Sequence, residues 1–267
     1  MRIRTILLLL VTAAGIVGWQ AETRASLKQR LLLRSLAAQL APWGVLSYGP
    51  TTAHFWGRGE IRDLRFTPSP EWQAEGALHI PLLRYRDWQG GEAWPAAVHL
   101  QFDAATMALP EPWPTQARGE LDWRYRATEG DLRLQWSLDA PASAAIEATL
   151  ALQLTQPRQL RGATLASASL RYRDQGLAQG ERAALGQRLG ADPQNAEAAL
   201  AEQISQWLTV RGLPPNAALA SALREFTREP LAATLSLDPP GAIRPETLPQ
   251  FAPADRITAL GLRLEPR

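Results

Sequence analysis

The sequence predicts an α+β fold with an N-terminal membrane helix and an antiparallel β-rich body that contains a helical excursion near residues 175–229. Three observations support this class. Residues 5–19 form an uncharged, mostly apolar run, and apolar and polar residues alternate from about residue 45 to residue 173. After residue 174 helical spacing replaces the alternation. A period of two is typical of strands that bury one face and expose the other to water.

Composition limits the classes of protein that fit. The chain has 267 residues and 46% hydrophobic content, which is enough for a sizeable core. Residues 1–40 carry six basic residues and one acidic residue, which leaves 22 of the 28 basic and 25 of the 26 acidic residues, a net charge of −3, for the rest. A body of this charge argues against nucleic-acid binding, which needs a basic surface. The absence of cysteine excludes disulfides, thiol catalysis and thiolate metal sites.

The first segment, residues 1–22, is predicted to be a signal-anchor helix. A basic start before an apolar run is typical of an export signal. As a helix, residues 5–19 span about 22 Å against a hydrocarbon core of about 30 Å, so flanking residues must contribute, and Trp19 suits the far interface. We therefore expect a single-pass protein of the bacterial inner membrane with its body in the periplasm. The alternative is a cleaved signal peptide and a body that is secreted to the periplasm.

Residues 23–42 are predicted to form a juxtamembrane amphipathic helix. The leucines at 27, 31, 36 and 40 lie near one side of this helix, and the basic residues lie largely on another. Such a helix can lie along an anionic membrane surface. The positive-inside rule prefers these charges on the cytoplasmic side, which leaves an inward-facing body as an alternative. The expected membrane-interface residues are Trp19, Arg24, Lys28, Arg30 and Arg34.

The body, residues 43–267, begins with a strand-rich part at 43–174. Its clearest pattern is a hairpin, residues 121–126 and 132–138, in which Leu121, Trp123 and Tyr125 face one side. Proline clusters punctuate the remaining pattern. Further strands are predicted at 98–102 and 146–154, with weaker patterns at 45–48, 52–56, 60–66, 77–86 and 163–173.

The second part of the body is helical at 175–229 and returns to strands at 230–267. Asp192 and Pro193 form an N-cap and first-turn signal for a helix that Gly212 ends, and a second helix at about 216–229 stops before proline. Residues 231–237 and 260–264 alternate like strands. We expect these late strands to rejoin the first sheet.

The tripeptide Arg-Tyr-Arg occurs three times, around Tyr85, Tyr125 and Tyr172. In each copy the pleat sends the tyrosine to the buried side and both arginines to the other side. If the three strands are neighbours, the arginines could converge into an anion-facing stripe. Its members would be Arg84, Arg86, Arg124, Arg126, Arg171 and Arg173.

Motifs for catalysis and cofactor binding are missing. The sequence has no Gly-x-Ser-x-Gly, Walker or zincin motif, and Gly57-Arg-Gly59 precedes a strand-like pattern and is interpreted as a turn. The three histidines lie in separate predicted elements, away from metal-ligand spacing. We therefore predict a non-enzymatic protein with no catalytic residues, cofactor or metal.

One stretch carries a resemblance to a known family. Residues 56–66, Trp-Gly-Arg-Gly-Glu-Ile-Arg-Asp-Leu-Arg-Phe, follow an apolar N-terminal segment and combine a glycine turn with alternation. This layout resembles the AsmA-like group of bacterial envelope proteins over about the first quarter of the chain. The resemblance implies a periplasmic β-rich body and a role in lipid traffic or outer-membrane assembly. The chain departs from the larger members in its length and in its helical excursion.

Three hypotheses of function result. The first is an inner-membrane-anchored periplasmic protein in envelope maintenance that binds a lipid or an envelope-assembly partner. The second is a periplasmic protein-protein interaction module that binds no lipid, and the third is a hydrolase with an unrecognised carboxylate site. The first two differ in whether residues 175–229 cover the apolar face of the sheet or leave it open.

Overall fold

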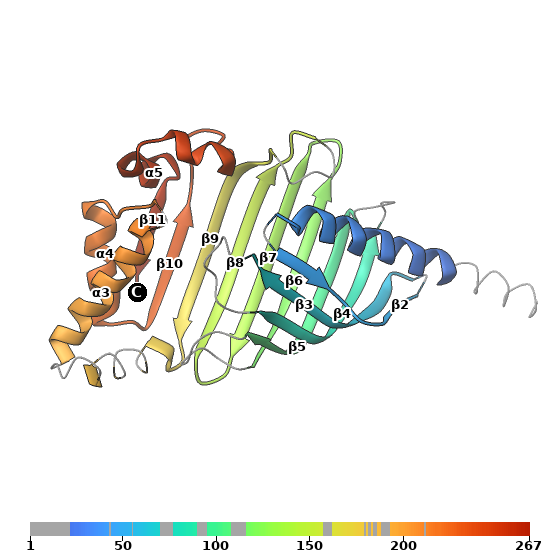
Figure 1. The fold of residues 1–267 in the computed structure, drawn as a ribbon, viewed down its shortest axis with the longest axis horizontal. Coiled ribbons are helices and arrows are strands. Elements are labelled where there is room, and N and C mark those ends of the chain that lie inside the picture. Colours follow the sequence, from blue (N-terminus) through green and yellow to red (C-terminus); the bar gives the residue numbers. More distant parts are fainter. Residues whose placement is uncertain are drawn as a thin grey trace, which may run out of the picture.

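One large antiparallel sheet of eleven strands dominates the molecule (Figure 1). The computed structural model describes residues 22–267 except 43, 55, 70–76, 90–94, 108–115, 157–161, 211 and parts of 179–192. The strands are β1 (Gly44–Ser47), β2 (Thr51–His54), β3 (Arg58–Pro68), β4 (Leu78–Gln89), β5 (Ala97–Met107), β6 (Ala117–Arg126), β7 (Asp131–Ala140), β8 (Ala144–Gln153), β9 (Thr164–Asp174), β10 (Ala232–Leu237) and β11 (Leu262–Pro266).

The sheet is a meander from β3 onward, because each strand pairs with the next strand in sequence up to β11. At its first edge β1 and β2 both pair with β3, β1 at residues 65–68 and β2 at residues 58–61. The excursion between β9 and β10 contains α3 (Pro193–Val210) and α4 (Ala217–Arg228). Between β10 and β11 lie η2 (Pro245–Gln250) and α5 (Pro253–Ala259). The late strands therefore rejoin the first sheet, as predicted.

The strand predictions are confirmed, including the hairpin, which is β6 and β7. The predicted facing of the tripeptides is also confirmed. Tyr85 and Tyr125 are buried and Tyr172 is half-buried, whereas all six flanking arginines are exposed. Alternation therefore identified the buried side of the sheet correctly.

The middle of β4 contains a proline that both neighbouring strands accommodate. By register Pro81 lies opposite Asp63 of β3 and Ala104 of β5. Both of these residues have positive φ, 50° and 54°. Because proline donates no backbone hydrogen bond, a central strand tolerates it only at an irregularity. The two left-handed residues supply that irregularity on each side of Pro81.

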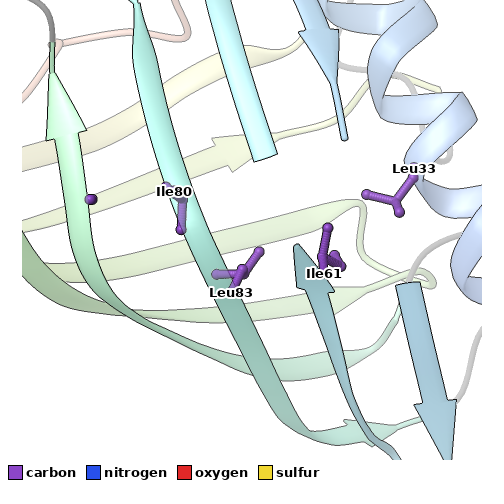
Figure 2. Packing of buried hydrophobic residues seen from close by; sticks show 5 residues of the cluster. Leu33, Ile61, Ile80 and Leu83 are labelled. Carbon is purple, nitrogen blue, oxygen red and sulfur yellow. The ribbon is translucent and has the colours of Figure 1, made fainter. Parts of the chain in front are cut away.

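Residues 22–40 form one helix that lies across the strands at the β3–β7 end of the sheet (Figure 1). Leu33 is buried against Ile61 and Leu83, and Figure 2 shows these side chains together. Gln29 is 2% exposed and its Nε2 donates to the Glu60 carbonyl oxygen at 3.2 Å. The predicted helix at 23–42 is therefore present, but one side of it packs on the sheet.

The predicted fold class needs correction. The body is one large antiparallel sheet of eleven strands, and helix 22–40, α4 and α5 pack on it. Within the part of the chain that the structure describes, no helix is both long and apolar enough to span a bilayer. The prediction of a fold led by a membrane helix is therefore wrong for the described chain, and residues 1–21, with Trp19, lie outside the described residues.

Candidate functional site

One face of the sheet is apolar across its whole width. The register aligns Tyr85, Leu100, Leu121, Trp136, Ala148, Leu170, Leu235 and Leu264 in one row that runs from β4 to β11. A second row contains Ile61, Leu83, Phe102, Gly119, Leu138, Ile146, Tyr172, Ala233 and Pro266. The sheet is ten strands across, because β1 and β2 both pair with β3, so at about 4.8 Å spacing it is about 43 Å wide.

Gly119 of the second row and Gly59 of β3, which pairs with Tyr85 of the first row, lie under aromatic rings. A Cβ on Gly59 would come 2.3 Å from the Tyr85 hydroxyl, and a Cβ on Gly119 would come 2.6 Å from the Phe102 ring. Each pair is also a register pair on adjacent strands. Glycine is therefore needed at both positions because the ring of the neighbouring strand occupies the space of a side chain.

Helix 22–40 covers the first end of the apolar face. Leu33 packs with Ile61, Ile80 and Leu83 in the core beneath the helix. Leu32 packs against a cluster around Leu132, toward the middle of the sheet. We call this helix the N-terminal cover.

The other end of the apolar face is covered by α4, η2 and α5. Leu219 and Leu223 of α4 and Ile257 of α5 form a buried cluster with leucines of β11. On α4, Phe226 meets the ring of Tyr172 edge to face, with the centroids 5.7 Å apart. We call these three elements the C-terminal cover.

Between the two covers lies a set of large apolar side chains that remain half-buried. None of them belongs to the core clusters under either cover, as far as the described residues show. They come from four consecutive strands, β6 to β9, and lie in the two aligned rows. We call this set the apolar strip; it consists of Leu121, Trp136, Leu138, Ile146 and Leu170.

The opposite face of the sheet is polar and held by cross-strand ion pairs. Arg118 donates to the Asp139 carboxylate through Nε at 2.9 Å and Nη2 at 2.6 Å. This hydrogen bond lowers the pKa of Asp139 below its usual value, while desolvation acts in the opposite direction. His99 lies 3.0 Å from Asp122 through Nδ1. The charged side chains therefore keep this face in water and the apolar face on the inside of the fold.

The structure does not bring the six predicted arginines together. They lie on β4, β6 and β9, and other strands separate these three. Most have an acidic neighbour: Arg84 lies 3.2 Å from Asp103, and Arg171 lies 4.0 Å from Glu147. An arginine that already faces a carboxylate has less capacity to attract an anion, so these residues form no common stripe.

The predicted membrane-interface residues occupy the outer side of the N-terminal cover. Arg24, Lys28, Arg30 and Arg34 are all exposed on the helix. The predicted leucine side is divided: Leu27 and Leu31 are exposed, and Leu36 and Leu40 are half-buried. Gln29 and Leu33 were not predicted to face the sheet, because a glutamine does not suggest burial in a helical pattern.

Burial under the covers raises the pKa of two tyrosines. Desolvation raises the pKa of Tyr85 to about 12. Desolvation also raises the pKa of Tyr172, and its hydrogen bond to the Asp174 carboxylate, 2.5 Å long, adds to this effect. Both phenols are therefore neutral at ordinary pH and behave as core residues.

The described residues contain no cluster of side chains arranged as metal ligands. No three His, Cys, Asp or Glu side chains of the described residues could hold one metal ion. Each histidine instead lies beside a carboxylate, His54 near Glu22 and His79 near Asp63, both at 3.4 Å. The arrangement is suited to binding at the apolar strip, a surface that sequence alternation could place on a face but could not show to lie between two covers.

The fold and the strip define a one-sheet protein whose apolar face is covered at both ends by its own helices. A family model described as "Uncharacterized protein" matches residues 127–266, from the turn before β7 into β11. This is more than half of the chain, so the chain belongs to that family. No curated protein and no solved structure matches the chain. The match lies outside residues 56–66, so the resemblance to the AsmA-like group stays a prediction.

Proposed function

We propose that the protein binds the hydrocarbon chain of a lipid on the apolar strip, without chemical conversion. One observation carries the proposal: five large apolar side chains on four adjacent strands are half-buried and belong to none of the core clusters that form under the two covers. Apolar surface that remains in water loses roughly 25 cal/mol per Å² relative to burial. A hydrocarbon chain lying on the strip would recover this free energy.

The backbone beneath the strip favours a hydrocarbon chain over a peptide. The strip lies on interior strands, where β6 to β9 pair with neighbours on both sides. Their N–H and C=O groups are therefore used within the sheet, and a peptide would find no strand edge there to extend. An apolar chain requires no hydrogen bonds and loses nothing on such a surface.

Titration with a fluorescent fatty acid tests this proposal. The double variant Leu121→Gln and Leu170→Gln places two amides on the strip and should weaken binding at least about tenfold, because an unpaired polar group in an apolar contact is unfavourable. The control Ser167→Gln changes an exposed position on β9 and should bind like the wild type. Circular dichroism of all three proteins checks that the sheet is intact. Equal affinity of the double variant and the control would contradict the proposal.

Trp136 provides a second readout within the strip. Binding should shift the emission of this tryptophan, and the Trp136→Phe variant should lose that spectral change while it keeps the affinity. The chain has ten tryptophans, so the difference spectrum between the two proteins is the informative quantity. A shift of the same size in both proteins would place the ligand elsewhere.

A second candidate function is docking of a protein on α3. This helix packs on α4 through Ile204 and Leu208, while Trp207 and Val210 are 53% and 72% exposed. Exposed aromatic residues are common anchors of protein interfaces. This function would be favoured over lipid binding if the lipid-free protein binds a partner protein stoichiometrically and the double variant Trp207→Ser, Val210→Ser does not.

A further inference from the structure

We propose that the outer side of the N-terminal cover docks the protein on an anionic lipid bilayer surface. The proposal concerns a different surface from the apolar strip and does not depend on lipid binding there. It starts from the division of helix 22–40 into a side that the sheet buries and a side that carries exposed leucines and basic residues.

The inner side of the helix is fixed. Leu33 is buried in the core, and the Gln29 amide donates to the backbone of β3. Residues four apart lie on one side of a helix, and residues two apart point in nearly opposite directions. Because Gln29 and Leu33 face the sheet, Leu27 and Leu31 must point away from it, and they are 58% and 46% exposed.

Basic residues surround the two exposed leucines. The helix carries Arg24, Lys28, Arg30 and Arg34, all exposed, and none forms an ion pair with a described residue. Its one acidic residue is Glu22, which lies 3.4 Å from His54. Leucines flanked by basic residues on the side of a helix that faces water are typical of a helix that lies in the plane of an anionic membrane.

The distribution of charge over the chain adds an orientation. The sequence after residue 40 has a net charge of −3, so positive charge is concentrated toward the N-terminal end. An anionic surface attracts the cover and repels much of the remaining body. Because the inner side of this helix packs on the β3–β7 end of the sheet, docking through the outer side places that end nearest the bilayer.

A lipid surface suits these residues better than a protein partner. Two leucines one turn apart offer far less area than the roughly 1,000 Å² that a specific protein interface buries. A bilayer requires only shallow insertion of such side chains together with attraction to its charged headgroups. We therefore commit to the bilayer, and binding of a second protein is an outcome that would overturn the proposal.

A fluorescent label tests contact directly. The chain has no cysteine, so Leu31→Cys introduces a single attachment site for an environment-sensitive dye. With vesicles of mixed phosphatidylcholine and phosphatidylglycerol we expect a blue shift of the dye, and with phosphatidylcholine alone little shift. The control label at Ser167→Cys lies on the polar face of β9 and should not respond. No shift at position 31, or equal shifts at both positions, would overturn the proposal.

Charge and leucine variants measure the contributions to docking. The double variant Arg24→Gln and Arg34→Gln should weaken partition to anionic vesicles about thirtyfold, at roughly 1 kcal/mol for each basic residue near such a surface. Leu27→Ser should weaken it about tenfold, since a leucine that inserts gains up to a few kcal/mol from burial. The matched control Arg171→Gln, Arg173→Gln removes two exposed arginines of β9 and should leave partition unchanged.

These variants also separate the two proposals. All of them keep residues 1–21, so any contribution of that segment to vesicle binding is common to every protein compared. Fatty-acid binding on the apolar strip should remain at the wild-type level in the variants of helix 22–40. Unchanged vesicle partition in both the charge and the leucine variant would overturn docking, whatever the fatty-acid result.

Discussion

The two covers bury opposite ends of one apolar face, but their contacts differ in chemistry. The C-terminal cover is joined to its surroundings through an apolar cluster around Ile257, and Arg256 donates to the carbonyl oxygens of Phe251, Gly212 and Pro249. The N-terminal cover buries Gln29, whose Oε1 has no hydrogen-bond partner among the described residues. The Arg256 guanidinium of the C-terminal cover is thus hydrogen-bonded, whereas the N-terminal cover buries an unpaired amide oxygen.

This difference indicates which cover detaches from the sheet more easily. An unpaired buried oxygen costs roughly 1–3 kcal/mol. In the C-terminal cover, α5 comes directly before β11 in sequence, so its contacts with that strand are local. Helix 22–40 instead packs on clusters of residues from β3 to β8, which lie farther away in sequence. We therefore expect the N-terminal cover to be the less stable of the two, and the predictions below test that ranking.

The largest expected effect is at the C-terminal cover. Ile257→Ala should lower the free energy of unfolding by about 4 kcal/mol, because this fully buried side chain leaves a cavity between α4, α5 and β11. Urea denaturation of wild type and variant measures the difference. The control Val210→Ala changes an exposed residue of α3 and should alter stability by less than about 0.5 kcal/mol. A loss below that of Leu33→Ala would reverse the ranking of the covers.

The N-terminal cover should respond less. Leu33→Ala removes its buried leucine and should cost about 3 kcal/mol. Leu27→Ala, on the outer side of the same helix, should change the free energy of unfolding by less than about 0.5 kcal/mol. Hydrogen exchange of residues 22–40 should rise in the first variant only. Similar losses in both variants would show that the helix faces the sheet with another side.

High pH should lower the free energy of unfolding, because Tyr85 and Tyr172 are desolvated at the two ends of the sheet and ionise more readily in the unfolded state. An unfolded tyrosine titrates near 10, whereas burial raises the pKa of folded Tyr85 to about 12. The unfolded state therefore loses its proton first, and the stabilisation present below pH 10 is lost as pH rises toward 12. The difference between these two pKa values corresponds to roughly 3 kcal/mol for Tyr85.

The measurement is the free energy of unfolding at pH 8 and pH 11.5 for the wild type, Tyr85→Phe and Tyr172→Phe. Each variant should lose less stability at high pH than the wild type, since it lacks one phenol that must ionise on unfolding. A pH dependence of Tyr85→Phe equal to that of the wild type would contradict burial of its hydroxyl beneath the N-terminal cover.

The smallest expected effect concerns Gln29. Gln29→Met removes both the unpaired oxygen and the bond to Glu60, and these changes nearly cancel. We expect a change of less than about 1 kcal/mol, neutral or stabilising. Gln29→Ala, which also leaves a cavity, should destabilise by about 2 kcal/mol and serves as the comparison. Destabilisation by methionine as large as by alanine would show that the amide is essential to the cover.

Alternation predicted the sheet well because the face on which a strand residue lies is determined by its position in the local sequence. Leu-Arg-Tyr-Arg in β4 and Trp-Arg-Tyr-Arg in β6 each place two apolar residues on one side and two arginines on the other. A helix that packs on a sheet is harder to orient from sequence, because its partners lie tens of residues away. The leucines at 27, 31, 36 and 40 were predicted to form one apolar side, yet Leu27 and Leu31 are exposed, Leu36 and Leu40 are half-buried, and the buried residues are Gln29 and Leu33.

The strip was only partly predictable for the same reason. Trp136 and Leu138 were assigned correctly to the buried side of the hairpin. Whether a given row position is covered depends on where the helices end in space, which no local pattern encodes. Helix α5 was not predicted because its seven residues, which begin with Pro253, make too few turns to show a helical period.

The meander has a consequence for how the chain can vary. From β3 onward every strand is joined in sequence to the strand beside it, so a hairpin can be gained or lost without rethreading any other strand. The family match begins at residue 127, immediately after the last residue of β6. That boundary falls at a turn between two strands, where such a chain can be divided with least rearrangement. A family of this architecture is free to share its C-terminal strands and helices while it changes the number of strands, and the helix, that precede them.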